Sequence, residues 1–139
     1  MFRRYPSAVA PRATATPGGS PAIQVFGIER DQATRAALRF FKERRTPISF
    51  VDLRKRPIAA GELRRFVERL GAEALLDISG RAYRDAGLGY LRMDEAGIVE
   101  RLLAAPALLR LPLIRNGHEV TAGRAETTWS AWLKPADRP

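Results

Sequence analysis

Few residues of this chain could do chemistry, and the most informative of them lies at a junction between two predicted elements. A short apolar run, residues 23–26, is followed by Gly27, a loop and Asp31, after which an amphipathic helix pattern begins. A cysteine at such a junction would be a reactive nucleophile, because a helix N-terminus favours the thiolate. The sequence contains no cysteine at all, so thiol catalysis, disulfides and thiolate metal sites are excluded.

Asp31 itself has two chemical interpretations. Aspartate is a preferred N-cap residue, because its carboxylate accepts hydrogen bonds from free N–H groups of the first turn and contributes about 1 kcal/mol to stability. Its charge there would also repel an incoming oxyanion from the partly positive helix end. An aspartate that acts as an acyl or phosphoryl acceptor needs a metal or a base nearby, and the sequence offers no such cluster. We therefore interpret Asp31 as a helix cap and expect no catalytic residue.

The histidine and tryptophan side chains fit structural positions. His118, the single histidine, is next to an Asn116-Gly117 turn, so we expect an exposed side chain and no metal site. Trp129 and Trp132 are three residues apart in a helical pattern. This spacing is more typical of core packing than of a platform on which bases stack.

Charge is a further compositional signal. The formal net charge of +9 suits an acidic partner such as nucleic acid, anionic lipid or an acidic protein face. No nucleic-acid-binding module or membrane-spanning run of about 18 apolar residues accompanies it, and the glycines at 87 and 89 lack the lysine of a phosphate-binding loop. We expect a protein partner, no direct DNA-binding motif, no membrane and a cytoplasmic location. The basic runs, which we expect on solvated edges, are residues 44–45, 54–56 and 64–65.

Hydrophobic periodicity predicts the elements that position these residues. Apolar residues with helical spacing predict three helices. The first begins after Asp31, the second ends at Gly71, and the third begins after Asp94 and is interrupted by Pro106. Asn116-Gly117 predicts a β-hairpin with a type I′ turn. Residues 72–90 contain several glycines and fit no single helix or strand. The order β-α-β, helices, β-β, α predicts a small α/β layer with a mixed sheet. The expected strands are residues 23–26, 48–51, 113–114 and 119–121, and the last helix is residues 124–133.

Composition divides the chain into a domain and two tails. Residues 1–21 contain three arginines, four prolines and no acidic residue, so we expect a disordered basic N-terminal tail. A transit peptide, a start codon assigned too far upstream or a basic arm that touches nucleic acid are the alternatives. We expect the folded domain over residues 22–134 and a short C-terminal tail at 135–139.

Two segments and the order of elements resemble a known family. The loop of residues 26–31, Phe-Gly-Ile-Glu-Arg-Asp, and residues 106–114, Pro-Ala-Leu-Leu-Arg-Leu-Pro-Leu-Ile, look like the arsenate reductase family, which includes the Spx-type transcription regulators. The resemblance covers residues 23–133. It implies an α/β, thioredoxin-like fold in which helices flank a mixed four-stranded sheet and a helical insertion follows.

The functional positions that the resemblance implies are largely changed in this chain. Family members usually have a cysteine at the start of the first helix, and some regulators have a second three residues later; Asp31 and Thr34 stand at these positions. Family reductases have an arginine directly before the proline of the third strand, where this chain has Leu111. The resemblance thus implies that two thiols and one anion contact are missing.

Other family positions are kept. Pro112 corresponds to a proline that is typically cis in this fold and presents backbone groups to a peptide or to glutathione. Arg124 falls twelve residues later, at the spacing of a family arginine. Arg81 is our candidate for a further arginine, with Ser79 or Gly80 as the alternative register. An ion pair of Asp31 with Arg124 or Arg81 is the remaining alternative to a simple cap.

Two functions follow as expectations. The first is a non-catalytic interaction or regulatory module, for which the Spx-type resemblance implies the C-terminal domain of the RNA polymerase α subunit as partner. The second is a reductase-like protein that binds glutathione or an oxyanion through Arg124 and the Pro112 backbone and relies on an external thiol. We expect no bound cofactor apart from this use of glutathione.

Overall fold

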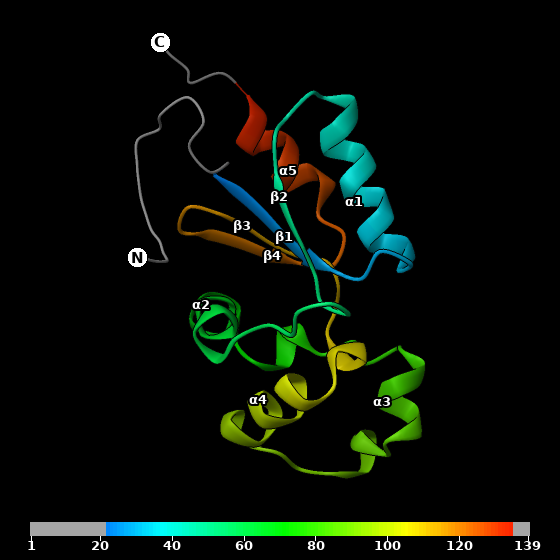
Figure 1. Ribbon diagram of the computed structural model, residues 1–139. Coiled ribbons are helices and arrows are strands. Elements are labelled where there is room, and N and C mark those ends of the chain that lie inside the picture. Colours follow the sequence, from blue (N-terminus) through cyan, green and yellow to red (C-terminus); the bar gives the residue numbers. More distant parts are fainter. Residues whose placement is uncertain (1–21, 135–139) are drawn as a thin grey trace.

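A mixed four-stranded sheet lies at the centre of the protein, whose computed structural model describes residues 22–134 (Figure 1). The two expected tails, residues 1–21 and 135–139, lie outside the described residues. Strands β1 and β2 are parallel, while β1 pairs antiparallel with β3 and β3 with β4, which gives the order β2-β1-β3-β4. The strands are β1 (Ile23–Gly27), β2 (Ser49–Asp52), β3 (Leu113–Asn116) and β4 (Glu119–Ala122). The expected mixed sheet is confirmed.

Helices cover both faces of this sheet. On one face lie α1 (Gln32–Glu43) and α5 (Glu126–Leu133), and on the other lies α2 (Ala60–Leu70) (Figure 1). The helical insertion follows α2 and extends that second layer, as expected. It comprises α3 (Arg81–Asp85), α4 (Glu95–Ala104) and three short 3₁₀ segments, η1 (Glu73–Leu75), η2 (Leu88–Tyr90) and η3 (Pro106–Leu108). None of the helices within residues 22–134 is long and apolar enough to cross a membrane.

The core under α1 and α5 is built around aromatic side chains. Trp129 is fully buried, with its ring centroid 5.4 Å from that of Phe40 and 5.7 Å from that of Phe41. Its indole Nε1 donates a hydrogen bond of 2.9 Å to the Thr121 hydroxyl on β4, so the polar atom of the buried ring is satisfied. The prediction that Trp129 packs in the core is confirmed.

A second core lies between the opposite face of the sheet and α2. Phe26 and Phe66 meet edge to face at 5.9 Å between ring centroids, and Leu113 is buried beside them. The same cluster continues through Ile98 and Leu102 of α4. Because the insertion shares this core with the sheet, it is part of the domain and not a separate unit.

Capping residues set several element ends. Asp94 caps α4, since its carboxylate accepts a hydrogen bond from the Gly97 N–H at 2.8 Å, and Gly71 ends α2 with a φ of +85°.

The turn of the β3–β4 hairpin differs from the predicted type. The two residues between β3 and β4 are Gly117 and His118, and of these only Gly117, at +64°, has a positive φ. This is the pattern of a type II′ turn and not of the expected type I′ turn, which needs a positive φ at both positions.

Trp129→Ala should lower the free energy of unfolding by about 3–5 kcal/mol, because it empties the centre of one core. The measurement is urea unfolding followed by circular dichroism. Trp132→Ala is the matched control: Trp132 is only half-buried and bonds Glu119 at the surface, so a loss of about 1 kcal/mol is expected. Equal losses in the two variants would contradict this account of the core.

Candidate functional site

The candidate site is the junction between β1 and α1, where Asp31 closes the start of the helix. Its backbone is extended (φ −69°, ψ 132°), and its Oδ2 accepts hydrogen bonds from the Thr34 N–H at 2.8 Å and the Thr34 hydroxyl at 2.9 Å. Its own N–H donates to the Ile28 carbonyl at 2.8 Å. The interpretation of Asp31 as a helix cap is confirmed, and the carboxylate occupies the place where the helix end would attract another anion.

Thr34 completes this network from inside the protein. The side chain is fully buried, and its Oγ1 donates to Asp31 while accepting the Ile28 N–H at 3.4 Å. It also packs tightly against β1: a Cβ at Gly27 would lie 2.5 Å from Thr34 Oγ1 and 2.6 Å from its Cγ2. Only glycine fits at position 27 without a shift, so Thr34 fills the space beneath the loop.

Leu111 and Pro112 run beside this junction. Both are buried, Leu111 with 8% of its surface exposed, and the peptide bond between them is cis. Extending the β1–β3 register beyond Phe26↔Leu113 places Leu111 opposite Ile28. Within residues 22–134 the backbone N–H and C=O of Leu111 form no hydrogen bond, whereas the Pro112 carbonyl accepts from the Gly123 N–H at 3.0 Å. Leu111 thus contributes its side chain to the core, while its backbone N–H and C=O stay without a partner within the described residues.

The two candidate arginines form local ion pairs and do not reach Asp31. The Arg124 guanidinium donates to the Glu126 carboxylate at 2.6 and 3.0 Å, and these hydrogen bonds lower the pKa of Glu126. Arg81 lies 3.4 Å from Asp85 and is 86% exposed at the start of α3. The structure therefore brings together Asp31 and Thr34, and the alternative in which Asp31 pairs with Arg124 or Arg81 is not observed.

Arg110 is a residue that the sequence reasoning missed. Its side chain lies over Gly123, where the Cβ of any other residue would lie only 2.8 Å from Arg110 Nε. Gly123 has a φ of +75° and donates to both the Arg110 and Pro112 carbonyls at 3.0 Å. The signal was present: Arg110 is one position before Leu111, where the resemblance implies an arginine.

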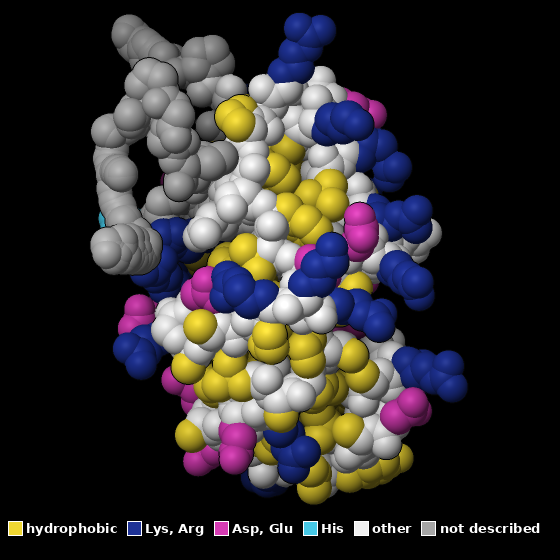
Figure 2. All heavy atoms as spheres, viewed as in Figure 1, with side chains coloured by type: hydrophobic (Ala, Val, Ile, Leu, Met, Phe, Trp, Pro, Cys, Tyr) yellow, Lys and Arg dark blue, Asp and Glu magenta, His cyan; other side chains and the backbone are white. Residues whose placement is uncertain are grey.

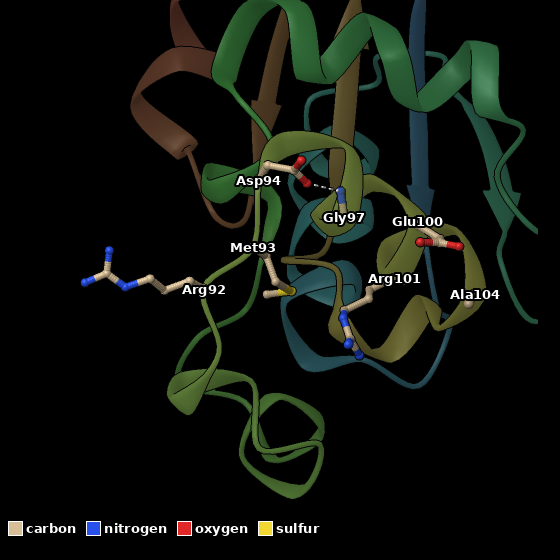
Figure 3. Close-up of a pocket in the computed structure, with 7 residues that line it drawn as sticks. All are labelled: Arg92, Met93, Asp94, Gly97, Glu100, Arg101 and Ala104. Carbon is tan, nitrogen blue, oxygen red and sulfur yellow. Dashed lines mark hydrogen bonds between the residues drawn. The ribbon is translucent and has the colours of Figure 1, made fainter.

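A hollow of about 660 Å³ along α4 is a second place to look for a site. Of its charged residues, Asp94 caps Gly97 and the Arg92 side chain extends away from the others, which leaves Glu100 and Arg101 on α4 (Figure 3). The described residues hold no group of three metal-ligating side chains, and His118 is exposed. The hollow thus offers one further carboxylate and one further guanidinium side by side on α4, and no group of metal ligands among the described residues.

The sheet order, the helices on both faces and the insertion define an α/β, thioredoxin-like fold. The solved structure of the YffB protein superposes with a TM-score of 0.75 at 23% identity, covering 81% of this chain and 99% of that one. An arsenate reductase from Vibrio cholerae superposes with a TM-score of 0.71 at 14% identity, covering 83% and 100%. At these identities the likeness shows the fold.

The family follows from the sequence comparison. The sequence model of the ArsC family matches residues 26–132, and the chain therefore belongs to the ArsC family. An arsenate reductase from Neisseria meningitidis is 26% identical over 107 residues, which cover 75% of this chain and 92% of the relative. The expected family and fold are confirmed, and this member lacks cysteine.

Asp31→Ala should cost about 1 kcal/mol of unfolding free energy, because it leaves the Thr34 N–H and hydroxyl without their acceptor. Asp31→Asn, which keeps a capping oxygen, should cost less. Chemical denaturation of both variants at neutral pH measures the difference. A loss in the asparagine variant as large as that in the alanine variant would show that the hydrogen bond to the cap is not what stabilises this helix.

Proposed function

We propose that this protein is a catalytically inactive member of the ArsC family that acts by binding another protein. The observation that carries the proposal is the Asp31 carboxylate, fixed at the N-terminus of α1 by two hydrogen bonds from Thr34. It leaves the site without a nucleophilic thiol and with a negative charge where an arsenate or phosphate would approach. Both changes oppose the reduction of arsenate, the reaction for which the relatives are named.

The surrounding side chains support the same conclusion. Leu111 is buried in the core between the sheet and α2, at the position where the resemblance implies an anion-binding arginine. Arg124 is engaged by Glu126, and Arg81 is a solvated residue of the insertion. An incoming oxyanion would have to displace existing ion pairs and overcome the repulsion of Asp31.

The backbone of Leu111 supports a binding function. Its free N–H and C=O, next to Pro112, are the groups that an extended peptide pairs with when it adds to a sheet. The loop of residues 28–31 borders this edge and carries the exposed Glu29 and Arg30. An extended segment of a partner protein is the ligand that this edge suits.

The partner that we propose to test first is the C-terminal domain of the RNA polymerase α subunit. The resemblance to the Spx-type regulators motivates this choice, and a cytoplasmic location would go with it. Charge supports an acidic partner face: the chain carries a formal charge of +9, and Lys and Arg side chains project along one edge of the molecule (Figure 2). Complementary charge would speed association and make the complex sensitive to salt.

The alternative function is binding of glutathione or an oxyanion with a thiol supplied by another molecule. The free Leu111 backbone favours it, because a glutathione peptide can pair with the same edge. Calorimetric titration of glutathione into the protein and into Arg124→Ala decides between the two. Saturable binding that is lost in the variant would support the alternative, and absence of binding would leave the protein-interaction proposal.

Asp31→Cys should restore a thiol without restoring arsenate reduction, because Leu111 provides no anion contact. The assay is arsenate-dependent oxidation of NADPH coupled through glutathione reductase, glutathione and glutaredoxin. Reaction of the variant with iodoacetamide would confirm that the thiol is accessible. An Asp31→Cys/Leu111→Arg double variant tests whether the anion contact is the missing part, and activity in the single variant would show that only the nucleophile had been lost.

The purified α-subunit domain should bind the protein with an affinity that falls as salt rises, measured by titration calorimetry. Arg30→Glu, in the loop beside Leu111, should weaken binding by about tenfold or more, the effect of about 1.4 kcal/mol. Arg39→Glu is the matched control, because it makes the same charge change on the exposed side of α1. No binding, or equal losses in the two variants, would contradict the proposed partner or the proposed edge.

A further inference from the structure

We propose that the groove between α2 and the β3–β4 hairpin binds the phosphate group of a small phosphorylated molecule. The groove has a volume of about 420 Å³ and is lined by Arg65, Arg69 and Arg115. It lies at the end of the sheet where Ile23 pairs with Asn116, whereas Asp31 follows the opposite end of β1. The inference is therefore independent of the function proposed above.

Arg115 is a charged residue on the face of the sheet that packs against α2. On β3 it alternates with Ile114 and lies on the same face of the sheet as Leu113, the face that packs against α2. One of its terminal nitrogens donates to Gln24 at 3.1 Å on the neighbouring strand. Its Nε is buried and has no hydrogen-bond partner within the described residues. The residue as a whole is half-buried, but a buried charged donor without an acceptor is costly, so an acceptor that reaches this nitrogen would stabilise it.

Helix α2 brings two more guanidinium groups to the same groove. Arg65 and Arg69 are four residues apart, so they lie on one face of the helix. Arg69 donates its Nε to the His118 carbonyl at 2.9 Å, which ties the helix to the hairpin and leaves its terminal nitrogens for another acceptor. Arg65 forms no ion pair within the described residues.

The positive charge of the groove is poorly compensated. Burial lowers the pKa of Arg115, and the nearby charge of Arg65 lowers it further; arginine nevertheless stays protonated in proteins. Glu62 acts in the opposite direction, but its carboxylate is already bound by Arg56 at 2.9 and 3.2 Å. Glu68 is the one carboxylate among the residues that line the groove. An anion bound between the three arginines would relieve their mutual repulsion.

The chemistry of the groove points to a phosphate group. Guanidinium groups bind phosphate through paired N–H donors, and such charge-assisted hydrogen bonds are the strong ones. The volume lies within the range of small-molecule sites, about 300–1,000 Å³. No Phe, Tyr or Trp side chain is among the described residues that line the groove, so it lacks the row of large aromatic rings on which the bases of a nucleic acid strand usually stack.

The test is calorimetric titration of the full chain with inorganic phosphate and with pyrophosphate, at an ionic strength held constant with sodium chloride. We expect saturable binding that Arg65→Gln and Arg115→Gln each weaken by at least about tenfold, since each variant removes a charge-assisted hydrogen bond to the anion. Arg64→Gln is the matched control. It removes the same charge from the same helix, but Arg64 lines a different hollow, between α2 and α4.

Three other results would overturn the proposal. Absence of saturable binding would do so, as would an equal loss of affinity in Arg64→Gln, which would show only a general charge effect. Loss of binding in Arg110→Gln with full binding in Arg65→Gln would place the anion near Pro112 instead. Circular dichroism checks that each variant is folded; if Arg115→Gln is not, the exposed Arg65 still decides the result.

Discussion

The fold depends on the burial of the central strand pair β1–β3 on both of its faces. Val25 and Ile114 point toward α1 and α5, whereas Phe26 and Leu113 point toward α2, and all four are at most 1% exposed. A strand buried on both sides has its register strongly fixed, because a slip by one residue would exchange the two cores. The same register determines where each chain segment leaves the sheet. It therefore places the loop that leads to Asp31 beside Leu111 at one end, and Arg115 beside Gln24 at the other.

The site at the first of these ends shows how one carboxylate can replace a ligand. The N-terminus of a helix presents unpaired N–H groups and a partial positive charge, which an external anion can satisfy. Here Asp31 satisfies them from within the chain, and the buried Thr34 hydroxyl holds it in place. The helix keeps its electrostatic stabilisation, while the carboxylate removes the attraction of the helix end for an external anion. An aspartate in place of a cysteine thus carries no cost in stability at this position.

The sequence predicted those features that local patterns determine. Strong periodicity indicated the main helices, and Asp31, Asp94 and Gly71 indicated their ends, because a cap depends on residues only a few positions away. The segment at 72–90 could not be assigned, since its short helices are held by a few buried anchors such as Leu75 and Leu88 and not by their own periodicity. The groove of Arg65, Arg69 and Arg115 was missed for a related reason: Arg115 is distant in sequence from the two arginines of α2, and only the register of β3 and the packing of α2 bring the three together.

The close contact between Gly27 and Thr34 constrains the routes by which this sequence can change. Any side chain at position 27 would collide with the branched side chain of Thr34, so the two positions are epistatic. A smaller residue has to appear at position 34 before position 27 can vary. Serine would keep the hydroxyl oxygen that lies 2.5 Å from a Cβ at position 27, so the replacement has to remove the hydroxyl that holds Asp31. Descendants of this protein can therefore diversify the loop only along ordered paths, and they pass through an intermediate in which the helix cap is weakened.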